Sequence, residues 1–120
     1  MNEFDARVRI DGGMAVIELA GTIDNGAEPA LDAAYAPCGE PGVRTVALDF
    51  TAVDYINSTG IALLVSLLAK ARRDGRPVVA WGLTDHYREI FEITRLADFL
   101  EVAADEQSAR GAIGVATGEE

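Results

Sequence analysis

The sequence has few of the side chains that build metal sites, and little basic charge. Its one cysteine, Cys38, has no partner for an internal disulfide, and its one histidine, His86, leaves too few thiolate and imidazole ligands for a metal cluster. Ten Lys and Arg stand against 20 Asp and Glu, which gives a net charge of -10. Because such a surface repels phosphate backbones and anionic lipid headgroups, we expect no direct binding to nucleic acid or to a membrane.

Nucleotide-binding and targeting motifs are missing as well. The glycines of residues 21–42 fit neither a P-loop nor a dinucleotide fingerprint, and no Gly-Lys-Ser/Thr occurs. No apolar run reaches the length of a bilayer span, and the acidic first residues do not resemble a signal peptide. The sequence therefore predicts a cytoplasmic location.

The chain has the length and the 49% apolar content of one α/β domain. Apolar patterns and turn signals predict strands at residues 7–10, 14–19, 45–50, 78–81 and 99–102, and helices at 28–35, 60–73, 84–94 and 105–112. Helices between strands predict right-handed parallel crossovers, while the opening hairpin adds an antiparallel pair. We expect a mixed sheet of about five strands, with four helices mainly on one face. The domain is predicted over residues 5–112, followed by a frayed acidic tail at 113–120.

The clearest candidate site is a pair of hydroxyls, Ser58 and Thr59, at the start of the longest predicted helix. The first N–H groups of a helix lack carbonyl partners and carry partial positive charge. A serine there often only caps the helix. A phosphate on Ser58 would nevertheless be tolerated, because it would meet free N–H groups. The second hydroxyl and Gly60, which lets another backbone approach closely, favour phosphorylation.

A nucleophilic Ser58 is the enzymatic alternative. It would need a base within hydrogen-bond reach, and His86 is the one histidine available. Residues 56–60 also lack the two glycines that flank a serine elbow. We therefore expect no enzyme, and we interpret His86 as a solvated residue in the first turn of a helix.

Three acids lie near the predicted carboxyl ends of strands. Asp24 follows the second strand, Asp49 ends the third, and Asp54 lies in the turn after it. If these strands are parallel neighbours, the acids share one edge of the sheet with Ser58, where open sheets place ligand and partner sites. The alternative is that they are ordinary loop acids of an acidic protein.

The long helix has two different faces. A broad apolar arc should face the sheet, whereas the opposite strip of Ala62, Ser66, Ala69 and Arg73 is small and barely charged until its end. Such a strip is either an ordinary solvent face or a surface on which a partner docks.

Residues 46–61 (Val-Ala-Leu-Asp-Phe-Thr-Ala-Val-Asp-Tyr-Ile-Asn-Ser-Thr-Gly-Ile) resemble the signature of STAS domains, which include the anti-sigma factor antagonists and related domains of sulfate transporters. Residues 18–24 (Glu-Leu-Ala-Gly-Thr-Ile-Asp) and residues 90–102 resemble the flanking parts of the family pattern. Two positions depart from it, because Asn57 replaces the usual Asp and Arg95 stands where glycine is common.

The resemblance implies a partner-switching function. The phosphorylated hydroxyl of the family falls on Ser58, with Thr59 as second candidate, and Asp24, Asp54, Asn57 and Gly60 would shape the surface that the partner binds. The implied partners are an anti-sigma factor serine kinase, which the unphosphorylated antagonist binds, and a PP2C-type phosphatase. The domain itself would need no cofactor, because ATP belongs to the kinase. The alternative is a STAS scaffold that is not phosphorylated, such as a subunit of a signalling or lipid-transport complex, and Asn57 favours it.

Overall fold

The computed structural model describes residues 3–111, and its first two strands form the predicted hairpin. β1 (Asp5–Asp11) pairs antiparallel with β2 (Met14–Ile23), from Asp5 opposite Ala20 to Asp11 opposite Met14. Gly12 and Gly13 close the turn with φ values of 62° and 84°, a left-handed conformation that glycine adopts without a Cβ clash.

The remaining elements alternate as predicted. They are α1 (Glu28–Tyr35), β3 (Thr45–Ile56), α2 (Ser58–Arg73), β4 (Val78–Trp81), α3 (Asp85–Ile93), β5 (Glu101–Val102) and a helical segment at residues 106–111, with short 3₁₀ turns at Asn25–Ala27 (η1), Ala36–Gly39 (η2) and Leu96–Asp98 (η3). The sheet order is β1-β2-β3-β4-β5, and every pair after the hairpin is parallel. The α/β prediction with a mixed five-stranded sheet is confirmed. Residue 112 and the predicted tail at 113–120 lie outside the described residues.

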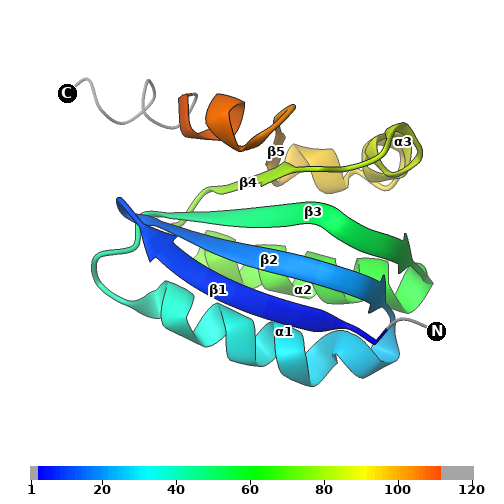
Figure 1. Ribbon diagram of the computed structural model, residues 1–120, viewed down its shortest axis with the longest axis horizontal. Coiled ribbons are helices and arrows are strands. Elements are labelled where there is room, and N and C mark those ends of the chain that lie inside the picture. The colour runs from blue at the N-terminus through cyan, green and yellow to red at the C-terminus, as the bar shows by residue number, and fades with distance from the viewer. Residues whose placement is uncertain (1–2, 112–120) are drawn as a thin grey trace.

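Most of the core lies on one face of the sheet. Figure 1 shows α1 and α2 packed against that face of β1, β2 and β3. Ile17 and Leu48 from the central strands are fully buried there, together with Leu64 of α2 and Phe91 of α3. The Phe91 ring meets Phe50 of β3 edge to face, with ring centroids 5.7 Å apart. The first three helices therefore share one core.

A smaller core lies on the opposite face, under the helical segment 106–111, drawn in orange in Figure 1. Val16, Ala47, Val79 and Trp81 of the sheet are buried with Ala109 of that segment. The expected arrangement of helices mainly on one face holds, with this last segment as the exception.

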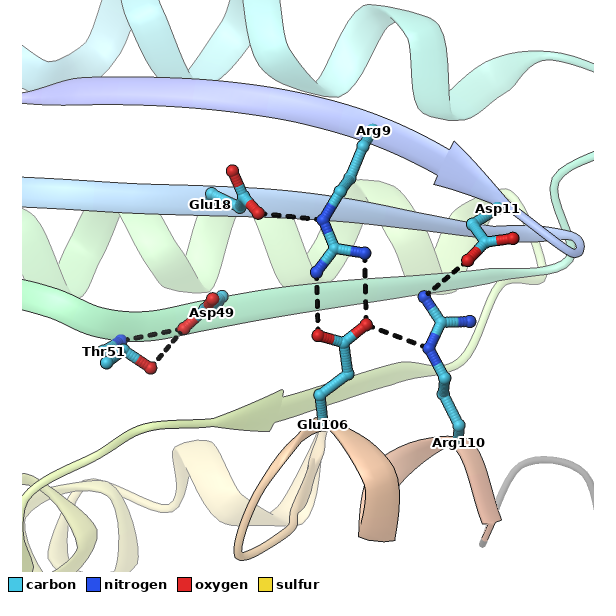
Figure 2. Close-up of polar contacts among 7 residues, drawn as sticks. All are labelled: Arg9, Asp11, Glu18, Asp49, Thr51, Glu106 and Arg110. Atoms are coloured by element: carbon cyan, nitrogen blue, oxygen red, sulfur yellow. Dashed lines mark hydrogen bonds and ion pairs between the residues drawn. The ribbon is translucent and has the colours of Figure 1, made fainter.

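Ion pairs hold the last segment to the hairpin (Figure 2). Both terminal nitrogens of Arg9 of β1 donate hydrogen bonds to the Glu106 carboxylate, at 3.1 and 2.8 Å. The Nε of Arg9 donates a hydrogen bond to Glu18 at 2.8 Å. Arg110 donates to Glu106 at 3.0 Å and forms an ion pair with Asp11 at 3.5 Å. The hydrogen bonds from Arg9 lower the pKa of the Glu106 carboxyl below its usual range.

β2 and β3 are both longer than predicted. Residues 20–23 and 51–56 were predicted to lie outside the strands, and this was wrong, because these two segments pair with each other in the sheet, from Ala20 opposite Ala52 to Ile23 opposite Ile56. Two register shifts accommodate the irregular sequence. At the first, the Asp49 carboxylate accepts hydrogen bonds from the Thr51 amide and hydroxyl, an interaction that also occurs in turns (Figure 2).

Candidate functional site

The candidate site lies where β3 passes into α2. Asn57 occupies this junction and caps the helix: its side-chain oxygen accepts a hydrogen bond from the Gly60 amide at 2.8 Å, and its carbonyl accepts one from Ile61 at 2.9 Å. The Asn57 amide donates to the Ile23 carbonyl at the end of β2, at 3.2 Å. α2 therefore begins at Ser58, two residues earlier than predicted.

Ser58 is exposed and is not needed as a cap. Asn57 provides the capping oxygen, which leaves the Ser58 side chain without a capping role. The Ser58 hydroxyl makes no hydrogen bond to another of residues 3–111. Thr59 beside it is also exposed, and the first turn of α2 contains no acidic side chain. The positive end of the helix dipole is thus not compensated by an acid of its own first turn, so an added phosphate would be stabilised there.

Gly60 is required by the packing of α2 against β2. The residue is buried, and a Cβ at this position would lie 2.1 Å from the Ile23 carbonyl oxygen. This confirms the close backbone approach expected at Gly60.

The three acids predicted near the site lie at different positions along β2 and β3. Asp24 follows β2 directly and accepts a hydrogen bond from the Gly26 amide at 2.9 Å. Since Ile23 lies opposite Ile56, Asp24 and Asn57 are the first residues after the ends of the neighbouring strands β2 and β3. Asp49 and Asp54 instead lie within β3 rather than at its end, because the strand continues to Ile56. The predictions for Asp49 as a strand end and for Asp54 as a turn residue were wrong.

The predicted strip on α2 faces solvent between two hollows. Ala62, Ser66 and Ala69 are all exposed. Ser66 lines a polar groove against α1, while Ala69 lines an apolar groove against η3. The residues that line the apolar groove are Val65, Leu68, Ala69, Leu96 and Phe99.

Sequence reasoning missed two members of this surface and one residue behind it. Val65 and Phe99 are about half exposed and give the strip an apolar edge. Tyr87 of α3 is buried, and its hydroxyl accepts a hydrogen bond from the Ile56 amide at 2.9 Å. Its spacing of four from Phe91 on α3 was the available signal, because it places both aromatic side chains on one face of the helix, and a buried tyrosine usually needs a partner for its hydroxyl.

The residues needed for the hydrolase alternative are not brought together. His86 is exposed on α3, its ring packs edge to face on Tyr87, and no hydrogen bond joins it to Ser58 in the described part of the chain. Within residues 3–111, no group of three His, Cys, Asp or Glu is placed to hold a metal ion. The helices of this same range are all too short or too polar to cross a bilayer.

Comparison with known proteins identifies the family. Residues 6–102 match the family model described as "Mlab, STAS domain". The chain belongs to the STAS domain family. This STAS domain is 31% identical over 108 residues to a Bordetella bronchiseptica protein named provisionally as the anti-sigma factor antagonist BtrV, covering 90% of this chain and 92% of that protein. It is 28% identical over 86 residues to the anti-sigma-B factor antagonist of Staphylococcus aureus, covering 72% of this chain and 80% of that protein.

Solved structures show the same fold. The unphosphorylated form of the anti-sigma factor antagonist SpoIIAA superposes with a TM-score of 0.68 at 16% identity, over 97% of this chain and 99% of SpoIIAA. The phosphorylated form of SpoIIAA from Bacillus gives a TM-score of 0.67 at 18% identity, over 92% and 99% of the two chains. The predicted SpoIIAA-like fold is confirmed.

The second departure from the family pattern has a local structural effect. Arg95 has a φ of 68°, and it is the one non-glycine residue with positive φ in the range 3–111. Glycine adopts this conformation without steric cost, which is a physical reason for glycine at the turn between α3 and η3.

Proposed function

We propose that this STAS domain is an anti-sigma factor antagonist that binds an anti-sigma factor serine kinase and is released when that kinase phosphorylates Ser58. The observation that carries the proposal is the exposed Ser58 hydroxyl at the first position of α2, with capping left to Asn57. The anti-sigma factor antagonists among its relatives, and SpoIIAA structures in both phosphorylation states, support it.

The Asn57 departure is compatible with phosphorylation. Asn and Asp cap a helix about equally well through a side-chain oxygen, so the exchange keeps the hydrogen bond to the Gly60 amide. Asn57 also places no negative charge directly beside Ser58. A phosphate of about two negative charges would therefore meet less repulsion within this chain than it would beside an aspartate.

The switch acts by charge at the interface. Repulsion between the phosphate and an acidic group of the partner about 6 Å away costs around 3 kcal/mol per unit charge at an effective dielectric constant of about 20. This corresponds to a loss of about a hundredfold in affinity. The surface that docks is the exposed strip of Ala62, Ser66 and Ala69, which begins one turn after Ser58. A PP2C-type phosphatase would restore the complex.

Phosphorylation is tested by incubating the protein with the cognate anti-sigma serine kinase and ATP, followed by mass spectrometry. We expect one phosphate on Ser58, which is lost in Ser58→Ala and retained in Thr59→Ala. In a titration with the kinase, Ser58→Asp should bind at least about tenfold more weakly than Ser58→Ala. Gln107→Glu, which adds the same charge at an exposed position on the opposite face, is the control and should bind like the wild type. Equal binding of the two Ser58 variants would exclude the charge switch.

The second candidate is a scaffold that binds a partner regardless of phosphorylation. The apolar groove of Val65, Leu68, Ala69, Leu96 and Phe99 favours it, because such a groove can hold a partner side chain without reference to Ser58. Absence of phosphate on both Ser58 and Thr59, together with binding that Phe99→Ala abolishes, would select the scaffold.

A further inference from the structure

The end of β3 extends beyond the strand that pairs with it on one side. β4 lies against β3 only from Val46 to Asp49, whereas β2 accompanies β3 as far as Ile56. Past Asp49, the β4 side of β3 is occupied by the loop after β4 and by the first turn of α3. Gly82 of that loop approaches so closely that a Cβ there would lie 2.5 Å from the Thr51 amide nitrogen.

A tyrosine hydroxyl takes the place of the missing strand at Ile56. The Ile56 amide donates to Tyr87 Oη at 2.9 Å. The two residues are only 5% and 9% exposed, so water cannot easily replace this bond. Tyr87 is itself fixed, because its amide donates to the capping hydroxyl of Thr84 at 3.3 Å.

Two hydrogen bonds thus hold the junction from opposite sides. The Ile56 amide bonds to α3 through Tyr87, and the next amide, that of Asn57, bonds to the Ile23 carbonyl of β2. Ser58 is the residue that follows. The position of its hydroxyl therefore depends on α3 as well as on β2 and α2.

We propose that Tyr87 is a positioning residue for Ser58, holding the end of β3 so that the hydroxyl is presented at the first position of α2. This inference rests on the proposed function, because it assigns Tyr87 a role in phosphorylation of the same hydroxyl. Loss of the Tyr87 oxygen leaves a buried amide without a partner and lets the junction open locally. The Ser58 hydroxyl is then held less precisely in the position from which it is phosphorylated.

The first arm of the test needs no kinase. Tyr87→Phe removes one oxygen, and Tyr35→Phe is the matched control, because Tyr35 is also 9% exposed and its hydroxyl donates to Asp74 at 2.7 Å on another part of the molecule. Native-state hydrogen exchange should accelerate about fivefold to tenfold at Ile56 and Asn57 in Tyr87→Phe but not in Tyr35→Phe. Thr84→Ala, which removes the cap of the first turn of α3, is the second variant and should accelerate the same amides. Equal exchange at Ile56 in both tyrosine variants would overturn the proposal.

The second arm uses the cognate anti-sigma serine kinase and ATP. We expect kcat for Ser58 phosphorylation to fall about fivefold in Tyr87→Phe, because the hydroxyl is held less precisely for attack, while KM stays within about twofold, since docking on the α2 strip is unchanged. Tyr35→Phe should change neither constant. Unchanged kcat in Tyr87→Phe despite faster exchange would overturn the positioning role. If the kinase does not phosphorylate the wild type, the proposed function fails, and hydrogen exchange alone decides whether Tyr87 holds the junction.

Discussion

Replacing Gly60 by alanine should destabilise the protein, although alanine is the better helix former. The added methyl carbon would lie 2.1 Å from the Ile23 carbonyl oxygen and 2.8 Å from its carbonyl carbon. Since non-bonded carbon contacts are normally about 3.5–4.0 Å, the start of α2 must move by more than about 1 Å. Both atoms belong to the backbone of a buried strand and cannot rotate away.

The expected loss in the free energy of unfolding follows from three contributions. Forced backbone shifts cost about 1–3 kcal/mol, and loss of the bond from Asn57 to Ile23 costs about 1 kcal/mol. Removal of a helical glycine returns at most about 1 kcal/mol. We therefore expect Gly60→Ala to lose about 2 kcal/mol, or about 8 °C in Tm for a chain of this size.

The assay is urea unfolding, followed by the fluorescence of Trp81, the one tryptophan, which is 4% exposed in the folded protein. Gly111→Ala is the matched control, because Gly111 is also helical, and within residues 3–111 no atom lies within 4 Å of the place that an added methyl carbon would take. It should be neutral or stabilising by up to about 1 kcal/mol. If Gly60→Ala unfolded at the same urea concentration as the wild type or higher, the close packing of α2 on β2 would be refuted.

Three further predictions concern other parts of the fold. Arg9 lowers the pKa of the Glu106 carboxyl in the folded protein. The contribution of the ionised Glu106 to folding stability is therefore fully present above the unfolded-state pKa, and it is lost as the pH falls through the folded-state pKa. Urea unfolding should therefore show Glu106→Gln to be less stable by about 1 kcal/mol at pH 7, a value kept small by solvent screening, with a smaller difference at pH 3. A difference that did not change between the two pH values would argue against the ion pair. Arg95→Gly should raise stability by about 0.5–1 kcal/mol in the same assay, since the left-handed φ of 68° costs more than the loss of the exposed ion pair with Asp98. Burial raises the pKa of the Cys38 thiol to about 11, so iodoacetamide at pH 8 should modify Cys38 rapidly only in denaturant; rapid modification of the native protein would show that the thiol is accessible.

Local signals in the sequence were sufficient for the fold class and for the position of Ser58 and Thr59 at the start of a helix. Alternating apolar residues and glycine turns predicted the β1–β2 hairpin, and the apolar arc of α2 predicted its buried side. Ser58 and Thr59 were placed at a helix start because short polar residues preceded an apolar helical pattern. These predictions succeeded because propensity, patterning and capping depend on residues close together in the chain.

Other features could not be predicted, because they depend on contacts between distant segments. Residues 51–56 carry turn signals, and only pairing with β2 makes them a strand. That pairing moved Asp54 from a turn into a strand. Likewise, nothing near Tyr87 in the sequence specifies that its hydroxyl meets the Ile56 amide.

The sequence by itself determined the order of the elements, the acidic surface and the hydroxyl at the beginning of α2, since each is encoded within a few neighbouring residues or in composition. Tertiary structure alone decided that Gly60 lies against Ile23, that the Asn57 amide bonds to the Ile23 carbonyl, and that α3 supports the end of β3. The physical reason is that a buried hydrogen bond or a close backbone contact exists only when two segments distant in the chain are packed together.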